Sequence, residues 1–387
     1  MGLPYKGATT AQFYVAEVTP GVTPTNPAWS PLRSTSGVPA VTRDALVSNE
    51  LNGSREVSSI RTGNKQVTGE FAIELSSKSQ DDLLAGAMTS SWVAGDNIAG
   101  LSVAVNASAK TFTRATGDFT TVVSVGDLVR FPSLTGDNAK PFIVTAVTAT
   151  VITGAAILHT LTDQVATTTA LVTADYLWTG ALCKTFSVLT WFKGACGGAD
   201  AWVLTKGVEF SGFTIEQAVN AMVTGSFPFL GRSQEVLASL PSGSTFPTSF
   251  TASPFSSVDV SAFDGTAKLA LIDTFTITND NSTSAQFELG SDSVSFIERG
   301  NAANTFSLAG KLADLTLLNK FLAETKVELT SVLSGASGAM SFTLKNAELT
   351  AATPAIGGPE SVTISLEGQA TGKANQSSIV VQRITYP

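Results

Sequence analysis

Charged side chains are scarce in this 387-residue sequence, in which Asp, Glu, Lys and Arg together make up 14%. Average soluble proteins contain roughly 25% of these residues, and a free monomer normally covers its surface with them. Hydrophobic residues nevertheless reach 43%, which is enough for a sizeable core. We therefore expect a globular protein that covers much of its surface with copies of itself.

Histidine and cysteine are nearly absent, which limits the available chemistry. The one histidine, His159, would have to serve any Ser-His-Asp triad or histidine base, and no serine lies in a G-x-S-x-G motif. Together with Cys183 and Cys196 it supplies too few ligands for a zinc site. The sequence also lacks a G-x-x-x-x-G-K-[ST] phosphate loop. We predict that the protein is not an enzyme and that it carries no cofactor and no metal ion.

Clusters of basic residues and long apolar segments are missing too. The formal net charge is −8 and no three basic residues are consecutive, so tight binding of nucleic acid is not expected. An acidic surface would instead repel DNA. We find neither a secretory signal pattern at the N-terminus nor the roughly eighteen apolar residues of a membrane span. Two cysteines, expected as free thiols with a disulfide as the alternative, are typical of a cytoplasmic product.

Alternation of apolar and polar residues with a period of two dominates the sequence and predicts strands. In residues 69–75, for example, Phe71, Ile73 and Leu75 share one face, while Glu70 and Glu74 share the other. Further strands are expected at residues 186–192, 201–210, 215–229, 271–278, 340–349 and 362–366. Helices are expected at residues 79–88, where two aspartates suit the positive end of a helix, and at 312–324. The predicted fold class is mainly β, with one short helix in each half.

Two pairs of segments in the sequence resemble each other. Residues 53–64 match residues 290–301 at seven of twelve positions without a gap, and the strand and helix patterns that follow stay in step. Residues 206–227 match residues 345–366 more weakly and in the same order. The offset falls from 237 to 139 residues between the two matches, so the first copy carries about 98 additional residues. Chance similarity between β-rich segments is the alternative to a duplication.

These offsets divide the chain into expected domains. The first copy comprises residues 1–92 and 179–238, interrupted by an inserted β domain at residues 93–178. In that insertion, short β-branched runs alternate with turn signals. An insertion disturbs its host least on an exposed loop, so the inserted domain is expected to face outward. Residues 239–256, rich in Ser, Thr and Pro, form the predicted linker, and residues 257–387 form the second copy.

Several short motifs in the first copy resemble those of a known family. They are Arg61-Thr62-Gly63, Gly69-Glu70-Phe71, Asp82-Leu83-Leu84 and the segment at residues 213–227. In this order they resemble the major tail tube protein of long-tailed bacteriophages (siphophages), and the second copy follows the same plan less closely. The resemblance implies two β-sandwich or barrel domains of the tail tube type, each with a short helix. The inserted domain is expected to be a small β-barrel.

The same resemblance implies a structural virion protein that assembles as stacked rings around a lumen through which DNA passes during ejection. A chain with two tube domains would form trimeric rings with pseudo-sixfold symmetry, stacked head to tail, with hexameric rings as the alternative. Expected partners are further copies of the chain and the tail tip, tape measure and tail terminator proteins. Viral DNA would pass as non-specific cargo, and no membrane is involved. The protein would be made in the host bacterial cytoplasm and reside in the virion tail.

Six residues are candidates for contacts in this assembly. They are the acids Glu70, Glu74, Glu209 and Glu348 on the lumen wall, and Arg61 and Arg299 between subunits. Acids on the wall would keep DNA from adhering, whereas ordinary solvated strand residues are the alternative interpretation. Two other kinds of protein share the composition. One is another virion structural protein, from the baseplate or as a head decoration, and the other is a secreted glycan-binding β module, which usually exposes planar aromatic side chains.

Overall fold

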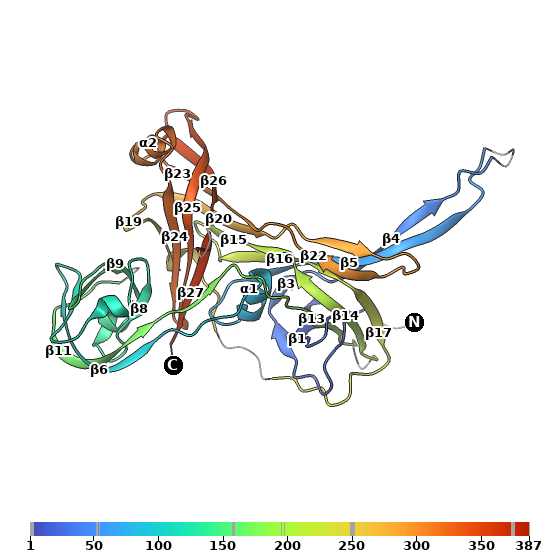
Figure 1. The fold of residues 1–387 in the computed structure, drawn as a ribbon, viewed down its shortest axis with the longest axis horizontal. Helices are drawn as coiled ribbons and strands as arrows, with labels where there is room; N and C mark the ends of the chain where they lie inside the picture. The colour runs from blue at the N-terminus through green and yellow to red at the C-terminus, as the bar shows by residue number, and fades with distance from the viewer. Residues whose placement is uncertain are drawn as a thin grey trace.

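Strands make up most of the regular structure in the computed structural model of this chain (Figure 1). The structure describes residues 4–51, 53, 55–156, 159–194, 196, 198–247, 252–372 and 376–386. Within these residues it has two α-helices, one in each half of the chain, and a closed barrel of strands. The prediction of a mainly β fold with a small additional barrel is confirmed. No helix in the described segments has the length and apolar character that crossing a membrane requires.

The N-terminal half forms two sheets that enclose a core. One sheet has the order β2–β1–β13–β14–β17, and the other has the order β4–β5–β16–β15, with β3 also paired to β5. The elements of this half are β1 (Ala11–Ala16), β2 (Ser30–Leu32), β3 (Ser34–Ser36), β4 (Ala40–Val47), β5 (Ile60–Glu74), α1 (Asp81–Ala87), β13 (Phe186–Phe192), β14 (Ala201–Phe210), β15 (Gly212–Ala218), β16 (Thr224–Gly231) and β17 (Ser233–Leu237).

The C-terminal half has the same two-layer plan. One sheet contains β20, β23, β26 and the end of β25, and the other runs from β18 through β24 and the start of β25 to β27. A small hairpin, β21–β22, lies apart from both sheets. The elements are β18 (Val260–Asp264), β19 (Ala267–Lys268), β20 (Ile272–Asp280), β21 (Ser284–Phe287), β22 (Val294–Glu298), β23 (Ala303–Lys311), α2 (Thr316–Leu322), β24 (Val327–Gly335), β25 (Gly338–Ala355), β26 (Thr363–Ala370) and β27 (Ile379–Thr385).

Strand pairings of the first half recur in the second. The pairs β1–β13, β13–β14, β14–β17 and β5–β16 have the counterparts β18–β24, β24–β25, β25–β27 and β23–β26, all antiparallel. A short helix follows β5 in one half and β23 in the other. Strands β16 and β26 also lie at the offset of 139 residues seen in the sequence, since 224–231 corresponds to 363–370.

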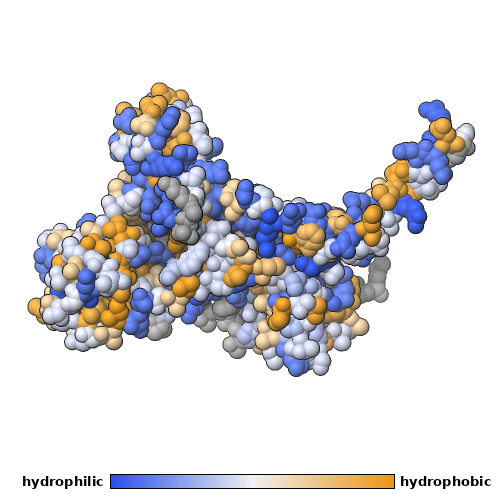
Figure 2. All heavy atoms as spheres, viewed as in Figure 1, coloured by the Kyte–Doolittle hydropathy of each residue, from blue (hydrophilic) through white to orange (hydrophobic). Residues whose placement is uncertain are grey.

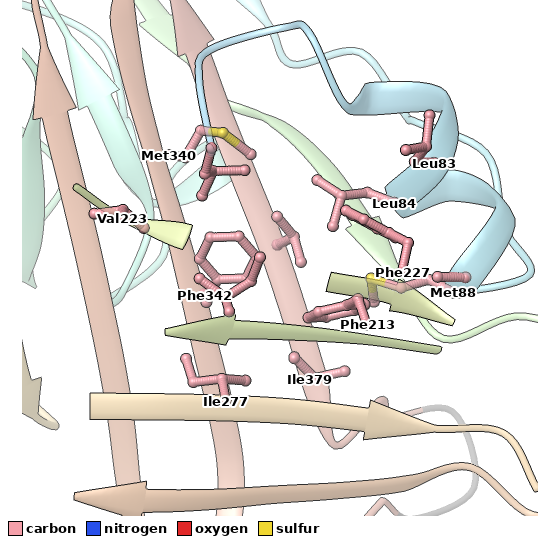
Figure 3. Close-up of a cluster of buried hydrophobic side chains, with 14 of the residues drawn as sticks. Leu83, Leu84, Met88, Phe213, Val223, Phe227, Ile277, Met340, Phe342 and Ile379 are labelled. Atoms are coloured by element: carbon pink, nitrogen blue, oxygen red, sulfur yellow. The ribbon is translucent and has the colours of Figure 1, made fainter. Parts of the chain in front are cut away.

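One hydrophobic core joins the two halves. It combines residues of β5, α1 and β13 to β16 with residues of β20 and β23 to β27 in a single cluster. Figure 3 shows Leu84 and Met88 of the α1 segment beside Phe213 and Phe227, with Phe342 of the second half in the same cluster. The alternation of apolar residues explains this, because side chains at every second position of a strand point to one face. The two halves are therefore packed as one body.

Most expected elements lie where the sequence placed them, but one expected strand is wrong. Residues 215–229 form two strands, β15 and β16, rather than one. Asn220 lies between them with a φ of 58°, a left-handed conformation that Asn adopts more readily than most residues. The apolar alternation continues across this turn, so periodicity alone does not reveal it. Part of the predicted linker is also packed, since Phe246 meets Phe13 with ring centroids 4.8 Å apart.

The inserted barrel lies against the second half of the chain. Its strands close in the order β10–β7–β6–β11–β8–β9 around a phenylalanine-rich core. They are β6 (Asn97–Asn106), β7 (Thr111–Arg114), β8 (Leu128–Arg130), β9 (Phe142–Val147), β10 (Val151–Ala156) and β11 (Gln164–Thr173). The chain leaves the barrel as β12 (Asp175–Trp178), which pairs with β27. Leu128 and Ile143 pack on Val332 and Ile384, and the Gln382 side chain accepts a hydrogen bond of 2.7 Å from the Leu128 backbone N–H.

Candidate assembly surfaces

A continuous sheet crosses from one half of the chain to the other. Strand β15 pairs with β20 over seven residues, from Gly212 opposite Asp280 to Ala218 opposite Thr274. This pairing joins β4–β5–β16–β15 to β20–β23–β26–β25. One face of the sheet carries buried apolar residues such as Phe71, Ile215 and Leu308. We call the opposite face, formed by β5, β16, β15, β20, β23 and β26, the polar sheet face.

Hydroxyl and carboxylate side chains line the polar sheet face. Residues directly opposite each other in an antiparallel ladder share a face, so the register identifies them. One row crosses all six strands: Glu74, Thr224, Glu216, Thr276, Ser307 and Glu367. The next row continues with Ser226, Thr214, Thr278, Thr305 and Gln369. The arrangement gathers carboxylates on a hydroxyl-rich wall, and Lys311, at the end of β23, is a basic residue on the same face.

Three of the four predicted acids lie on this side of the sheet. Glu70 and Glu74 lie on the polar sheet face on β5, and Glu348 lies beside it on β25, opposite Gln369, where it also pairs with Lys326 at 3.5 Å. Glu216 and Glu367 were not selected from the sequence, although both follow the same alternation of apolar and polar residues. Each lies next to an inward-facing apolar residue, but only the pairing of all six strands shows that these acids share one row.

The expectations for Glu209 and Arg299 need correction. The Glu209 side chain is 1% exposed, so its carboxylate cannot face a solvent-filled channel. It forms ion pairs with Arg299, from the other half of the chain, and with Arg232 at 3.6 Å. Burial raises the pKa of the Glu209 carboxyl, while the two guanidinium groups act to lower it. Arg299 is therefore engaged within its own chain rather than held free for a neighbouring subunit.

The polar sheet face ends at two unpaired strand edges. In the described residues, β4 pairs only with β5, and residues 351–355 of β25 pair only with β26. Every residue of β4 is exposed. Free edges present unpaired N–H and C=O groups, which are a template for pairing with another chain.

Strand β4 and the start of β5 also form an arm that projects from the body (Figure 1). Its exposed apolar residues include Leu46, Val47 and Ile60, and Figure 2 shows apolar residues along its length. Arg61 is exposed on this arm, opposite Leu46. The base of the arm is held by a salt bridge of 3.2 Å between Lys65 and Asp292. Exposed apolar side chains on a thin projection favour contact with another protein surface.

Groups with the potential for chemistry are dispersed. His159 lies in the segment between β10 and β11, where burial lowers its pKa, and its charged neighbours are Asp137 and Lys140. Cys183 and Cys196 are both free and exposed. Among the described residues, no three His, Cys, Asp or Glu side chains gather where they could hold a metal ion.

A comparison with known protein families finds a match that covers most of this fold. The family model described as phage tail tube protein matches residues 7–370, a span that includes the barrel and the strands of both halves from β1 to β26. No curated protein matches the sequence. Since the match covers nearly the whole chain, this protein belongs to the phage tail tube protein family and is a structural component of the phage tail.

Proposed function

We propose that three copies of this chain close a ring with pseudo-sixfold symmetry and that the rings stack head to tail into the tail tube of a siphophage. DNA would pass through the lumen during ejection. The observation that carries the proposal is the single sheet that spans both halves, apolar on its core side and lined by hydroxyls and carboxylates on the other. In this arrangement, each half of the chain fills one of six positions around the channel.

The recurring strand pairings support a duplicated tube domain. The first copy would comprise residues 1–92 and 179–238, the inserted domain 93–178, the linker 239–256 and the second copy 257–387. The helices differ in a way that fits this division. Helix α1 lies where the halves meet, and Leu83 and Leu84 are buried. No residue of α2 is buried, and Leu322 is exposed, which suits a helix that a neighbouring subunit covers.

Ring closure follows from the free edges. At the offsets of the repeat, residues 351–355 correspond to β15, and β4 corresponds to the region of β20. Strands β15 and β20 pair with each other within the chain. Their counterparts in the repeat, residues 351–355 and β4, each have one edge without a partner strand among the described residues. Pairing residues 351–355 of one copy with β4 of the next would repeat the internal junction. The register Thr214 opposite Thr278 then predicts Thr353 opposite Val41.

The polar sheet face would form the lumen wall. Its carboxylates repel the phosphate backbone, and its hydroxyls provide no fixed positive charge, so DNA would slide without adhering. The barrel packs on Val332 and Ile384, and these two side chains point away from the shared core. The barrel therefore lies on the side of the second half that faces away from the polar sheet face. It would decorate the outside of the tube. The tape measure, tail tip and tail terminator proteins would contact the lumen or the tube ends.

Cryo-electron microscopy of the purified, assembled protein tests the proposal. We expect hollow tubes in which each ring contains three chains, and in which Glu74, Glu216 and Glu367 face the lumen. Rings of six chains would contradict the pseudo-sixfold arrangement. Closed particles or stable monomers under all assembly conditions would instead favour a baseplate or head decoration protein.

A further inference from the structure

A groove lies between the inserted barrel and the sheet of the second half that runs from β18 through β24 and β25 to β27, which we call the outer sheet. It consists of two adjoining cavities of about 800 Å³ and 410 Å³, which share Trp178, Lys345 and Val380 in their walls. Its floor is the β12–β27 ladder, in which Tyr176 lies opposite Gln382 and Trp178 opposite Val380. The groove thus exists only because the chain leaving the barrel adds a strand to the second half.

Two aromatic rings form a platform in this groove. Tyr176 is 37% exposed and Trp178 is 38% exposed, whereas Leu177 between them is fully buried. The two rings are stacked, with centroids 5.1 Å apart and planes inclined by 28°. Alternation along β12 places both rings on the same face. Most large aromatic side chains of this protein are buried, so an exposed stacked pair in a concave site indicates a binding surface.

Polar groups surround the two rings. The side chains of Lys345, Asn346 and Gln376 line the larger cavity, and the charge of Lys345 acts to lower the pKa of the Asp127 carboxyl, which burial raises. The Thr179 hydroxyl, also in this wall, is buried without a hydrogen-bond partner among the described residues. The carboxylate of Glu328 lines the same cavity. The site therefore offers amide, ammonium, hydroxyl and carboxylate groups beside the remaining exposed surface of two stacked rings.

We infer that this groove binds a neutral saccharide chain. A sugar ring presents an apolar C–H face, which packs on an aromatic ring, and a rim of hydroxyls that donate and accept hydrogen bonds. Amides and charged groups arranged around Tyr176 and Trp178 match that rim. Nucleic acid also stacks on aromatic rings, but Asp96, Asp127 and Glu328 in the same walls would repel its phosphates. The mixed charges of the site favour an uncharged, hydroxyl-rich ligand.

The groove faces away from the polar sheet face. Trp178 and Val380 lie on the side of the outer sheet that carries the barrel, whereas Leu177 and Val381 point into the core. If the polar sheet face lines the lumen, the groove opens on the outside of the tube. Only this accessibility rests on the proposed function, because the unassembled chain would bind the same ligand.

Binding to immobilised oligosaccharides tests the inference. The probes are maltohexaose, cellohexaose and chitohexaose, with polygalacturonate as an acidic comparison, presented to the full chain both unassembled and as tubes. We expect at least one neutral glycan to bind. The variants Trp178→Ala and Tyr176→Ala should weaken that binding about tenfold, the loss expected for one aromatic stacking contact. Tyr5→Ala removes an exposed aromatic ring outside the groove and should leave binding unchanged.

Further variants and outcomes test whether the groove binds saccharide through the Trp178 ring. Trp178→Phe keeps a ring face and should retain part of the binding, while thermal unfolding shows whether each variant is folded. Failure of the wild-type chain to bind any neutral probe, or equal binding by Trp178→Ala, overturns the inference. If the unassembled chain binds saccharide and assembled tubes do not, a neighbouring subunit covers the groove. That result overturns the inference that the groove is a binding site on the outside of the tube. Tube formation is scored separately by microscopy, so failure of the proposed function is distinguishable from failure of the groove.

Discussion

At the scale of single residues, Glu209 shows how burial changes the role of an acid. Its carboxylate is enclosed and paired with Arg299 and Arg232, two residues from different halves of the chain. Removing one member of a buried ion pair leaves the remaining charge without compensation, which typically costs about 3 kcal/mol or more. Glu209 therefore compensates the charges of two guanidinium groups where the halves meet.

We expect Glu209→Ala to lower the free energy of unfolding of the unassembled chain by about 3 kcal/mol. Urea denaturation measures this change. The matched control is Glu235→Ala, which breaks the more exposed pair with Lys206 and should cost less than about 1 kcal/mol. Similar losses in the two variants would contradict a special role for Glu209.

The acids of the polar sheet face are exposed, unlike the buried Glu209, and they lead to a different prediction. Glu216 and Glu367 are exposed and lie in the same row. The double variant Glu216→Lys/Glu367→Lys should still form tubes, because neither side chain is part of the core. A basic wall neutralises phosphates, so the tubes should retain short duplex DNA in a salt-dependent manner.

Co-sedimentation of DNA with assembled tubes measures this retention. Glu298→Lys/Glu360→Lys makes the same change of charge at exposed positions outside the polar sheet face. Equal retention by both double variants would show that DNA binds on net charge alone. Absence of DNA retention by Glu216→Lys/Glu367→Lys tubes would remove the argument for a lumen wall at this face.

At the scale of elements, the unpaired edges define a register between neighbouring subunits. We predict that Val41→Cys/Thr353→Cys, made in a chain with Cys183→Ser and Cys196→Ser, forms inter-subunit disulfides after assembly. Directly opposed residues of antiparallel strands have Cα atoms roughly 4.5–5.5 Å apart, within disulfide range. Non-reducing electrophoresis of oxidised tubes should show covalent trimers.

Val47→Cys/Thr353→Cys is the matched control, because Val47 lies six positions along the same exposed strand. It should form no defined oligomer. Cross-linking at the control position in place of Val41 would mean that the strands meet in another register. A ladder extending to six chains would indicate hexameric rings.

Elements were the most predictable part of this fold. Strands β13 and β14 begin and end where the alternation indicates, because a half-buried strand needs only its own local pattern. The hairpin of β15 and β16 was missed, since its apolar alternation runs on through a turn made by Asn220. Pairings between distant strands, such as β15 with β20, leave no local pattern.

At the scale of the whole molecule, the barrel is part of the body rather than a loosely tethered appendage. It covers Phe263, Val332 and Ile384 on the outer sheet, and its two ends are neighbours, since the Thr173 N–H donates to the Asp96 carbonyl at 3.0 Å. A short Gly-Ser linker can therefore replace residues 97–173 and leave β12 in place. The deletion uncovers an apolar patch.

We expect this deletion to lower Tm by roughly 5 °C or more and to cause aggregation, because apolar area returns to water. Calorimetry and light scattering measure the two effects. Adding Val332→Thr/Ile384→Thr to the deletion should restore a soluble chain that forms tubes. A rescued chain that stays soluble but does not assemble would show that the barrel takes part in subunit contacts.

The sequence alone determined the class of the fold, the position of most strands and the face on which Glu70 and Glu74 lie. These properties depend on the alternation of neighbouring residues, which is visible in any stretch of the chain. Tertiary structure decided that Glu209 is buried, that β15 joins β20 and that the barrel and β12 create a groove with Tyr176 and Trp178. Each of these depends on residues far apart in the chain, whose contacts arise only when the two halves pack together.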